Sequence, residues 1–369
     1  MSEWKTYKLG DVVDMRNGKK RPKEAGNFPV YGGNGILDYT NQYNAENVIV
    51  VGRVGAYCGS VYRCKQKCWV SDNAICVNSK PIIDDNFLFY LMSSLDFHHF
   101  HIGGAQPLMT QDIIGSFEIS LPPLEEQKRI ADILSAIDDK IELNRRINAN
   151  LEQQAQALFD EIMSCELEYD LIANIPHVIE TGKRPKGGVA SITSGIPSIG
   201  AENIKGLGYY DYSKTKYITE EFAITLKKGF VNGYELLIYK DGGKPGYFIP
   251  NFSIFGNGFP YNKMALNEHV FLLDFRNKGY NFFAYFYFQQ EKIMRYLNAQ
   301  GSKAAIPGIN RNDIENISVP TIQNKVIQDF CRQTENIITH ILNNASESRK
   351  LSIVRDALLP KLISGKIKI

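Results

Sequence analysis

Apolar residues recur at alternating steps of four and three along a long segment near the middle of the chain. The series contains only two polar members and runs through Ile130, Leu134, Ile137, Ile141, Asn144, Asn148, Leu151, Ala155, Leu158 and Ile162. This alternation is the a/d spacing of a coiled coil. Because the segment follows Pro122 and Pro123 and then lacks Pro and Gly as far as Met163, we expect one uninterrupted helix.

The two polar members of the series, Asn144 and Asn148, are adjacent and central. Buried asparagine at such positions fixes the register of paired helices at some cost in stability, so we assign both residues to the register of a helix pair.

The end of the chain offers a partner for this helix. Residues 321–369 have a polar centre, NNASES, flanked by the apolar residues Ile327, Phe330, Ile337, Ile341, Leu351, Leu358 and Leu362. Polar breaks in both segments favour their pairing with each other as an antiparallel, intramolecular coiled coil. Homodimeric pairing of each helix is the alternative.

The rest of the chain contains one pattern twice. GKKRPK after Asn17 is similar to GKRPKG after Thr181. Each copy continues with a buried strand and a Gly-rich turn (47–62 and 234–249), an aromatic segment (87–92 and 281–288) and a loop ending in Asp-Ile (103–113 and 301–314). Each copy then enters a short strand and a long helix. A period this long indicates a duplicated domain.

The pattern predicts a mixed α/β (α+β) fold with pseudo-two-fold organisation. We expect globular domains at 1–122 and 166–320, and long helices at 123–165 and 321–369. Short apolar strands bounded by Gly, Asn and Asp indicate twisted, largely antiparallel sheets. The aromatic segments read as helices that continue to the glycines at 103 and 301.

Composition narrows the class of protein. Apolar residues make up 44% and charged residues 22% of the chain, as in ordinary globular proteins. No apolar run approaches the ~18 residues of a membrane span, and the charged N-terminus lacks the core of a signal peptide. We therefore expect a cytoplasmic protein that does not engage a membrane. Cys58, Cys64, Cys68 and Cys76 lie near HHFH in sequence, which makes a zinc site conceivable; reduced, packed cysteines are the alternative.

Positive charge is concentrated although the net charge is only +2. RNGKKRPK (Arg16 to Lys23) and TGKRPKGG (Thr181 to Gly188) are both basic. Two related basic loops on a near-neutral body are suited to binding the phosphates of DNA.

Motifs of catalysis are missing from the sequence. None of its Gly-Lys pairs continues as a phosphate-binding loop, and no dinucleotide-binding glycine pattern follows a strand. No Asn/Asp-Pro-Pro-Tyr/Phe box of the amino-methyltransferase kind occurs, and Asp138 and Asp139 lie within the long helix, where a solvated face explains them. We expect a binding protein without a catalytic or metal site.

Three stretches carry a resemblance to a known family. VVGRVGAYCGSVY with CWVSDNAICV, then GGAQPLMTQDIIGSFEISLPPLEEQKRIADIL, and finally ALLPKLISGKIKI resemble the specificity (S) subunit of type I restriction–modification enzymes, the HsdS family. The second domain departs from the first in having YKDGGKPG and GSKAAIPGINRNDI at the matching places.

The resemblance implies a division of labour. Each globular part, a target recognition domain, would read one half of a bipartite target in double-stranded DNA. The helices would set the spacer and dock two methyltransferase (M) subunits, which modify adenines with S-adenosylmethionine. Restriction (R) subunits would then join, with ATP and Mg. The chain itself would be non-catalytic and hold none of these cofactors.

Loop position and side-chain chemistry give the candidate DNA-binding residues. Those suited to phosphates are Arg16, Lys19, Lys20, Arg21, Lys183 and Arg184. Those placed in the Gly-rich turns are Arg53, Tyr57, Lys240 and Lys244. Those able to address base edges are Gln106, Thr110, Gln111, Ser302, Lys303 and Arg311.

Two other functions remain open on the sequence. A coiled-coil protein–protein scaffold would bind no DNA sequence specifically. A self-contained DNA methyltransferase would have to bind S-adenosylmethionine.

Overall fold

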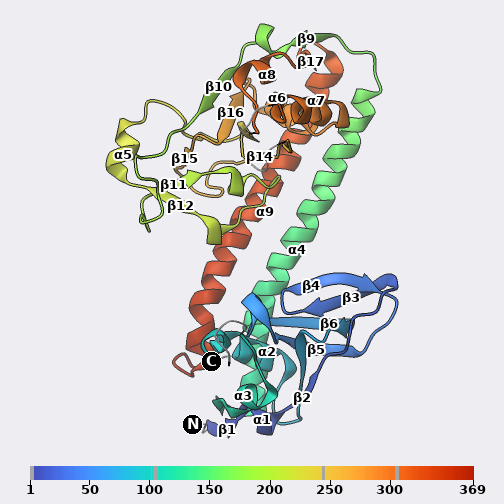
Figure 1. Cartoon of the computed structure of the whole chain (residues 1–369), viewed down its shortest axis with the longest axis vertical. Helices are drawn as coiled ribbons and strands as arrows, with labels where there is room; N and C mark the ends of the chain where they lie inside the picture. Colours follow the sequence, from blue (N-terminus) through green and yellow to red (C-terminus); the bar gives the residue numbers. More distant parts are fainter. Residues whose placement is uncertain (1–3, 101, 103–106, 243–245, 304–306) are drawn as a thin grey trace. The chain divides into compact units, whose positions relative to one another are not determined.

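A computed structural model describes residues 4–100, 102, 107–242, 246–303 and 307–369 (Figure 1). The chain divides into two compact units. Unit 1 comprises residues 1–140 and 351–369, and unit 2 comprises residues 141–350. Each long helix therefore contributes one end to each unit. Within the described ranges, no helix is both long enough and apolar enough to cross a membrane.

Unit 1 is built on a six-stranded sheet with the order β2-β7-β5-β6-β3-β4. All neighbours are antiparallel except β3 and β6. The bounds are β2 Val13–Asn17, β3 Ala25–Gly32, β4 Gly35–Thr40, β5 Ala45–Gly52, β6 Val61–Val70 and β7 Ala74–Ser79. The other elements are β1 Lys5–Lys8, which pairs with β8 Glu118–Leu121, and the helices α1 Leu9–Val12, α2 Asp85–Ser94 and α3 Gln111–Ser116.

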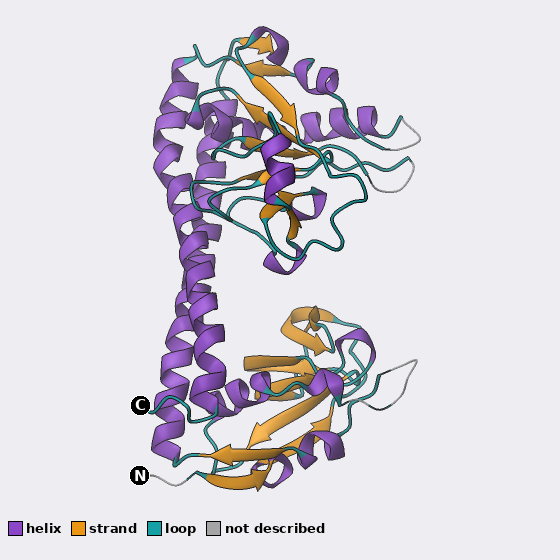
Figure 2. Cartoon of the chain, turned by 90° about the vertical axis from the view of Figure 1, so that its left-hand side faces the viewer, coloured by secondary structure: helices purple, strands orange, loops and turns teal. Residues whose placement is uncertain are grey.

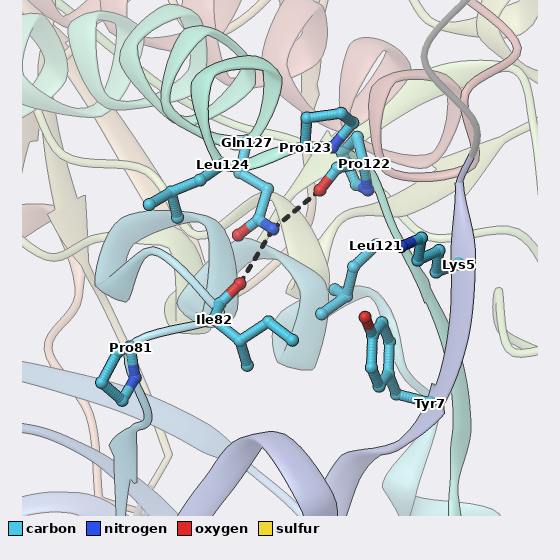
Figure 3. A pocket seen from close by; sticks show the side chains of 9 residues that line it. All are labelled: Lys5, Tyr7, Pro81, Ile82, Leu121, Pro122, Pro123, Leu124 and Gln127. Carbon is cyan, nitrogen blue, oxygen red and sulfur yellow. Dashed lines mark hydrogen bonds between the residues drawn. The ribbon is translucent and has the colours of Figure 1, made fainter.

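Local chemistry explains where the helices of unit 1 begin. The Asp84 carboxylate accepts hydrogen bonds from the amides of Asn86 and Phe87, and so caps α2. The apolar face of α2 packs with the first turns of α4 (Leu124–Met163) and the last turn of α9 (Lys325–Ile363) in one core. Gln127 of α4 is buried there, and its amide nitrogen donates to the carbonyls of Ile82 and Pro122 (Figure 3).

Unit 2 contains a four-stranded sheet with the order β10-β16-β13-β14. Its strands are β10 Val178–Thr181, β13 Leu236–Tyr239, β14 Phe252–Ile254 and β16 Val270–Asp274. A second sheet joins β11 Ile196–Ile199, β12 Lys216–Ile218 and β15 Ala265–Leu266, and β9 Tyr169–Leu171 pairs with β17 Ser318–Pro320. The helices are α5 Glu220–Thr225, α6 Lys278–Phe288, α7 Glu291–Gly301 and α8 Arg311–Glu315.

The connectivity of unit 2 repeats that of unit 1. The strand order β10-β16-β13-β14 matches β2-β7-β5-β6, and the β9–β17 pair matches β1–β8. The helices α6, α8 and α9 follow the strands of unit 2 as α2, α3 and α4 follow those of unit 1. The mixed fold and the duplication predicted from the sequence are confirmed.

The two long helices lie side by side within each unit (Figure 2), and the order of their contacts shows that they run antiparallel. In unit 1, Asp138 pairs with Arg355 at 2.7 Å. In unit 2, the Asn144 amide donates to Glu347 Oε2 at 2.8 Å, while Asn148 donates to the carbonyl of Ile341 at 3.0 Å. Every position of the predicted a/d series on α4 is buried or half-buried. The intramolecular pairing is therefore confirmed.

Two helix predictions are wrong in extent. The helix expected to run through residues 281–301 is two helices, because Gln290 is extended (φ −60°, ψ 140°) and starts α7. Helix α2 ends at Ser94, since Leu95 is also extended.

Candidate nucleic-acid interface

Three loops and the start of α3 meet at one end of the six-stranded sheet of unit 1. Strands β2 and β5 end there and β7 begins there, because both pair antiparallel with β7. The Lys19 amide donates to the Val70 carbonyl at 3.0 Å, and the Arg53 amide donates to that of Asn73 at 2.9 Å. The Gln111 side chain donates to Asn17 Oδ1 at 3.1 Å. The basic loop, the Gly-rich turn, the loop ahead of β7 and the start of α3 therefore form one surface.

The same loops meet in unit 2. The Lys240 amide donates to the His269 carbonyl at 2.9 Å, as Arg53 does to Asn73. Gly242 donates to Pro307 at 2.9 Å, as Gly55 does to Pro107 at 3.1 Å. These bonds place Lys240 at the position of Arg53. They also equate the loop 267–269 with the loop 71–73.

A glycine in each basic loop permits a close approach to the residues just ahead of β7 in unit 1 and just ahead of β16 in unit 2. These two strands are called the central strands below. A Cβ atom added to Gly18 would lie 2.0 Å from the Ser71 carbonyl oxygen, and one on Gly182 would lie 1.6 Å from that of Leu266. Only glycine fits there. This steric need explains the Gly-Lys pair with which both basic motifs open.

The basic residues of the two Gly-rich turns are tethered alike. The Arg53 guanidinium donates to the Asp72 carbonyl at 3.3 Å, and the Lys240 ammonium donates to the Glu268 carbonyl at 3.2 Å. Each cation is thus fixed on the loop ahead of the central strand.

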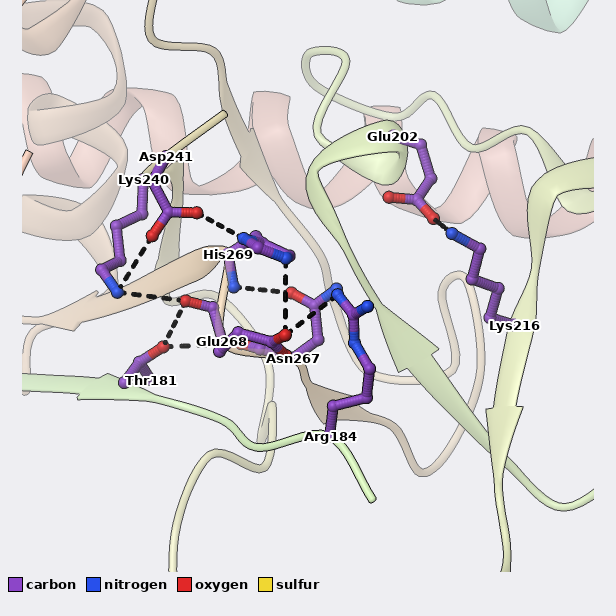
Figure 4. Close-up of polar contacts among 9 residues, drawn as sticks. All are labelled: Thr181, Arg184, Glu202, Lys216, Lys240, Asp241, Asn267, Glu268 and His269. Carbon is purple, nitrogen blue, oxygen red and sulfur yellow. Dashed lines mark hydrogen bonds and ion pairs between the residues drawn. The ribbon is translucent and has the colours of Figure 1, made fainter. Parts of the chain in front are cut away.

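In unit 2, ion pairs lie around the hydrogen bond from Lys240 to the Glu268 carbonyl (Figure 4). Arg184 contacts Glu268 Oε1 at 3.0 Å, and His269 Nε2 lies 3.4 Å from the same oxygen. The other ring nitrogen of His269 contacts Asp241, which also pairs with Lys240 at 3.2 Å. Carboxylates therefore balance the cations of this surface in unit 2.

The phosphate candidates of unit 1 are exposed. Arg16, Lys19, Lys20 and Arg21 all have exposed side chains. Arg16 donates to the Asn44 carbonyl at 2.7 Å, and Arg21 lies 3.7 Å from Asp38. Such contacts between exposed groups stabilise little, so these cations remain able to bind phosphates.

The base-edge candidates differ in how free their side chains are. Thr110 accepts from the Ile113 amide and so caps α3. Arg311 pairs with Glu315 at 2.8 Å, and Lys303 donates to Gln300 at 2.7 Å. The Ser302 hydroxyl is buried.

The remaining loop candidates stay predictions. Tyr57 is 49% exposed, and Lys183 is exposed. Gln106 and Lys244 lie outside the described residues.

The cysteines form no metal centre in the described part of the chain, where no group of three His, Cys, Asp or Glu residues could hold an ion. All six thiols are free, and Cys58, Cys64, Cys68 and Cys76 are buried. A hydrogen bond from Cys68 lowers the pKa of Cys64 to about 7, and the same bond raises that of Cys68.

Comparison with known proteins shows which family the chain resembles. The family described as "Type I restriction modification DNA specificity domain" matches residues 1–153. The type I restriction enzyme HindI specificity subunit of Haemophilus influenzae is 22% identical, and the alignment covers 79% of both chains. The EcoprrI specificity subunit of Escherichia coli is 28% identical over 145 residues, which cover 37% of this chain and 36% of that protein. Residues 1–153 are thus similar to the DNA specificity domain of type I restriction–modification systems, and most of the chain is similar to specificity subunits of such systems.

A solved member of the type I specificity-subunit family agrees in fold. The crystal structure of the S subunit from M. genitalium has a TM-score of 0.60 and 17% sequence identity, and the match covers 98% of this chain and 96% of that one.

Sequence reasoning missed the loop ahead of the central strand. Asp72 and Asn73 of unit 1 and Glu268 and His269 of unit 2 lie beside the candidate cations. An alignment of the two copies by their buried strands would have pointed to them.

Proposed function

We propose that this chain is the DNA-reading subunit of a type I restriction–modification complex. In this proposal the loop surface of unit 1 reads one half of a bipartite target, and that of unit 2 reads the other. The observation that carries it is the repetition of one loop surface, with a basic Gly-rich turn tethered in the same way in both units. Each surface offers cations for phosphates and polar side chains for base edges.

Exposed apolar residues on the long helices support the docking of partner subunits. Leu143 and Ile147 of α4 are 41% and 38% exposed, and their spacing of four places them on one face. Ile353 and Val354 of α9 are 51% and 47% exposed. Apolar side chains on an otherwise polar helix are suited to a protein interface. We propose that two methyltransferase subunits dock along these helices, which also set the gap between the half-sites.

In the same proposal the chemistry belongs to the partners. S-adenosylmethionine would be bound by the methyltransferase subunits, and ATP and Mg would serve the restriction subunits. The chain would supply recognition and no catalytic group.

Selection from a pool of random DNA duplexes tests the proposal. The full chain, alone and with co-expressed methyltransferase subunits, should enrich two short fixed blocks separated by a constant number of unspecified base pairs. Capture of duplexes without any common sequence would instead support a scaffold that binds DNA through charge alone.

A further inference from the structure

The loop ahead of the central strand carries an acidic residue at the same place in both units. Gly52 pairs with Ala74 in unit 1, and Tyr239 pairs with Val270 in unit 2. Counting back two residues from Ala74 and Val270 reaches Asp72 and Glu268. The carbonyls of these two residues hold Arg53 and Lys240. The equivalence of Asp72 and Glu268 therefore rests on the strand pairing and on the hydrogen bonds from Arg53 and Lys240.

An acidic side chain is unfavourable on a surface that binds phosphates. An ionised carboxylate only accepts hydrogen bonds, so it repels phosphates and also the acceptor groups of guanine and thymine. The Asp72 side chain is exposed, and the described part of the chain supplies it with neither a hydrogen bond nor an ion pair. The fold of unit 1 therefore does not account for its charge.

DNA does offer donors that a carboxylate can accept from. In the major groove these are the exocyclic amino groups, N4 of cytosine and N6 of adenine. Adenine presents the acceptor N7 beside its amino group, which repels the second carboxylate oxygen. Cytosine presents the amino group alone, so it fits a carboxylate better.

Glu268 of unit 2 uses only one of its two carboxylate oxygens in the contacts of the described structure. Its Oε1 is held by Arg184 and lies near His269. Its Oε2 is buried without a hydrogen-bond partner in the described structure, which is an unfavourable state for a carboxylate oxygen. The Glu268 side chain as a whole is 41% exposed, so rotation of its carboxylate toward bound DNA would bring Oε2 to a donor and relieve that cost.

We infer that Asp72 and Glu268 are specificity determinants, each accepting a hydrogen bond from the amino group of a cytosine in its own half-site. The inference rests on the proposed function. Arg53 and Lys240, tethered to the same loop, then lie beside the acceptor and contact the neighbouring phosphates. Each surface thus combines a cation for affinity with a carboxylate for selectivity.

The test uses the full chain and a random duplex pool. Asp72→Ala should reduce the preference for cytosine at one position of one block by about 10- to 100-fold, and leave the other block unchanged. Asp72→Asn has one acceptor and one donor, the pattern that matches adenine, and should move the preference at that position toward adenine. Glu268→Gln should change a single position of the other block.

The control is Glu118→Gln, which removes one negative charge from β8, outside the loop surface. It should leave every base preference as it is. Thermal unfolding of each variant verifies that the unit carrying the substitution still folds.

The outcomes separate the inference from the proposed function. If the wild-type chain selects two blocks and Asp72→Ala keeps all base preferences, or strengthens binding to all sequences equally, the inference is overturned and the proposed function stands. If the wild-type chain selects no sequence, both are overturned.

Discussion

Asn144 and Asn148 lie one turn apart on α4, and replacing each with leucine should have different effects on stability. Asn144 is 1% exposed. Its amide nitrogen has three acceptors within 3.4 Å, but its Oδ1 is buried without a partner in the described structure. Both polar atoms of the Asn148 side chain have a hydrogen-bond partner. Its Nδ2 donates to the Ile341 carbonyl, and its Oδ1 accepts from the Asn344 side chain at 2.9 Å.

The magnitudes follow from these contacts. Asn144→Leu loses a hydrogen bond to the carboxylate of Glu347, worth about 1.5–3 kcal/mol, but removes an unsatisfied oxygen that costs about 1–3 kcal/mol. Leucine also buries more apolar surface, so we expect the free energy of unfolding to change by less than about 1 kcal/mol. Asn148→Leu loses two bonds and leaves the Asn344 amide without its acceptor. We expect it to cost about 2 kcal/mol.

A double-mutant cycle with Asn344→Ala sharpens the comparison. Asn148 contacts the Asn344 side chain, whereas Asn144 contacts only the Asn344 carbonyl, which the substitution keeps. The coupling energy should be about 1 kcal/mol for the pair with Asn148 and near zero for the pair with Asn144.

The assay is urea denaturation followed by helical circular dichroism, with hydrogen exchange of residues 141–163 to localise the change. Both tryptophans, Trp4 and Trp69, belong to unit 1, so their fluorescence is an internal control. A larger loss for Asn144→Leu than for Asn148→Leu would refute the reasoning about the unsatisfied oxygen.

Three further results are expected. Gln127→Ala should destabilise unit 1 by about 3 kcal/mol in tryptophan-detected unfolding, because the side chain also accepts from the Asp84 amide at 2.9 Å. The matched control is Gln66→Ala, at an exposed glutamine of the same unit, and equal losses would contradict the prediction. Burial raises the pKa of Glu152 from its ordinary value of 4.5, so the stability that this group contributes is lost as pH rises through the raised value. Glu152→Gln, which keeps an acceptor for Tyr285, should therefore unfold later than the wild type at pH 7 but not at pH 4, and an equal advantage at both pH values would count against this. If about six phosphates are neutralised, log K for duplex DNA should fall with a slope near −5 against log salt, and a salt-insensitive affinity would be inconsistent with charge-driven binding.

The periodicity of apolar residues and the internal repeat were enough to predict the fold of the chain, with its paired long helices and its duplicated domain. The a/d series gave the buried face of α4, and its two polar members lie opposite polar partners on α9. Periodicity did not give Phe159, which is 1% exposed, because the core of unit 2 also contacts this helix outside the a/d series. Packing of a helix against a globular body widens its buried face beyond the coiled-coil seam.

The site was less predictable than the scaffold. Basic residues stood out because charge clusters are visible along the chain. Asp72 and Glu268 did not, since the contacts that define their role join residues distant in sequence. The break at Gln290 was hidden as well, because no Pro or Gly marks it.

The most direct test of the central claim exchanges one recognition surface. Residues 7–120 are replaced by the matching residues of a relative with a different target, and the chimera is offered the same random duplex pool as the wild type. If each unit reads its own half-site, one block of the selected sequence changes, while the other block and the gap between them stay as they were. A change in both blocks, or in neither, would contradict the claim that each unit reads its own half of the target.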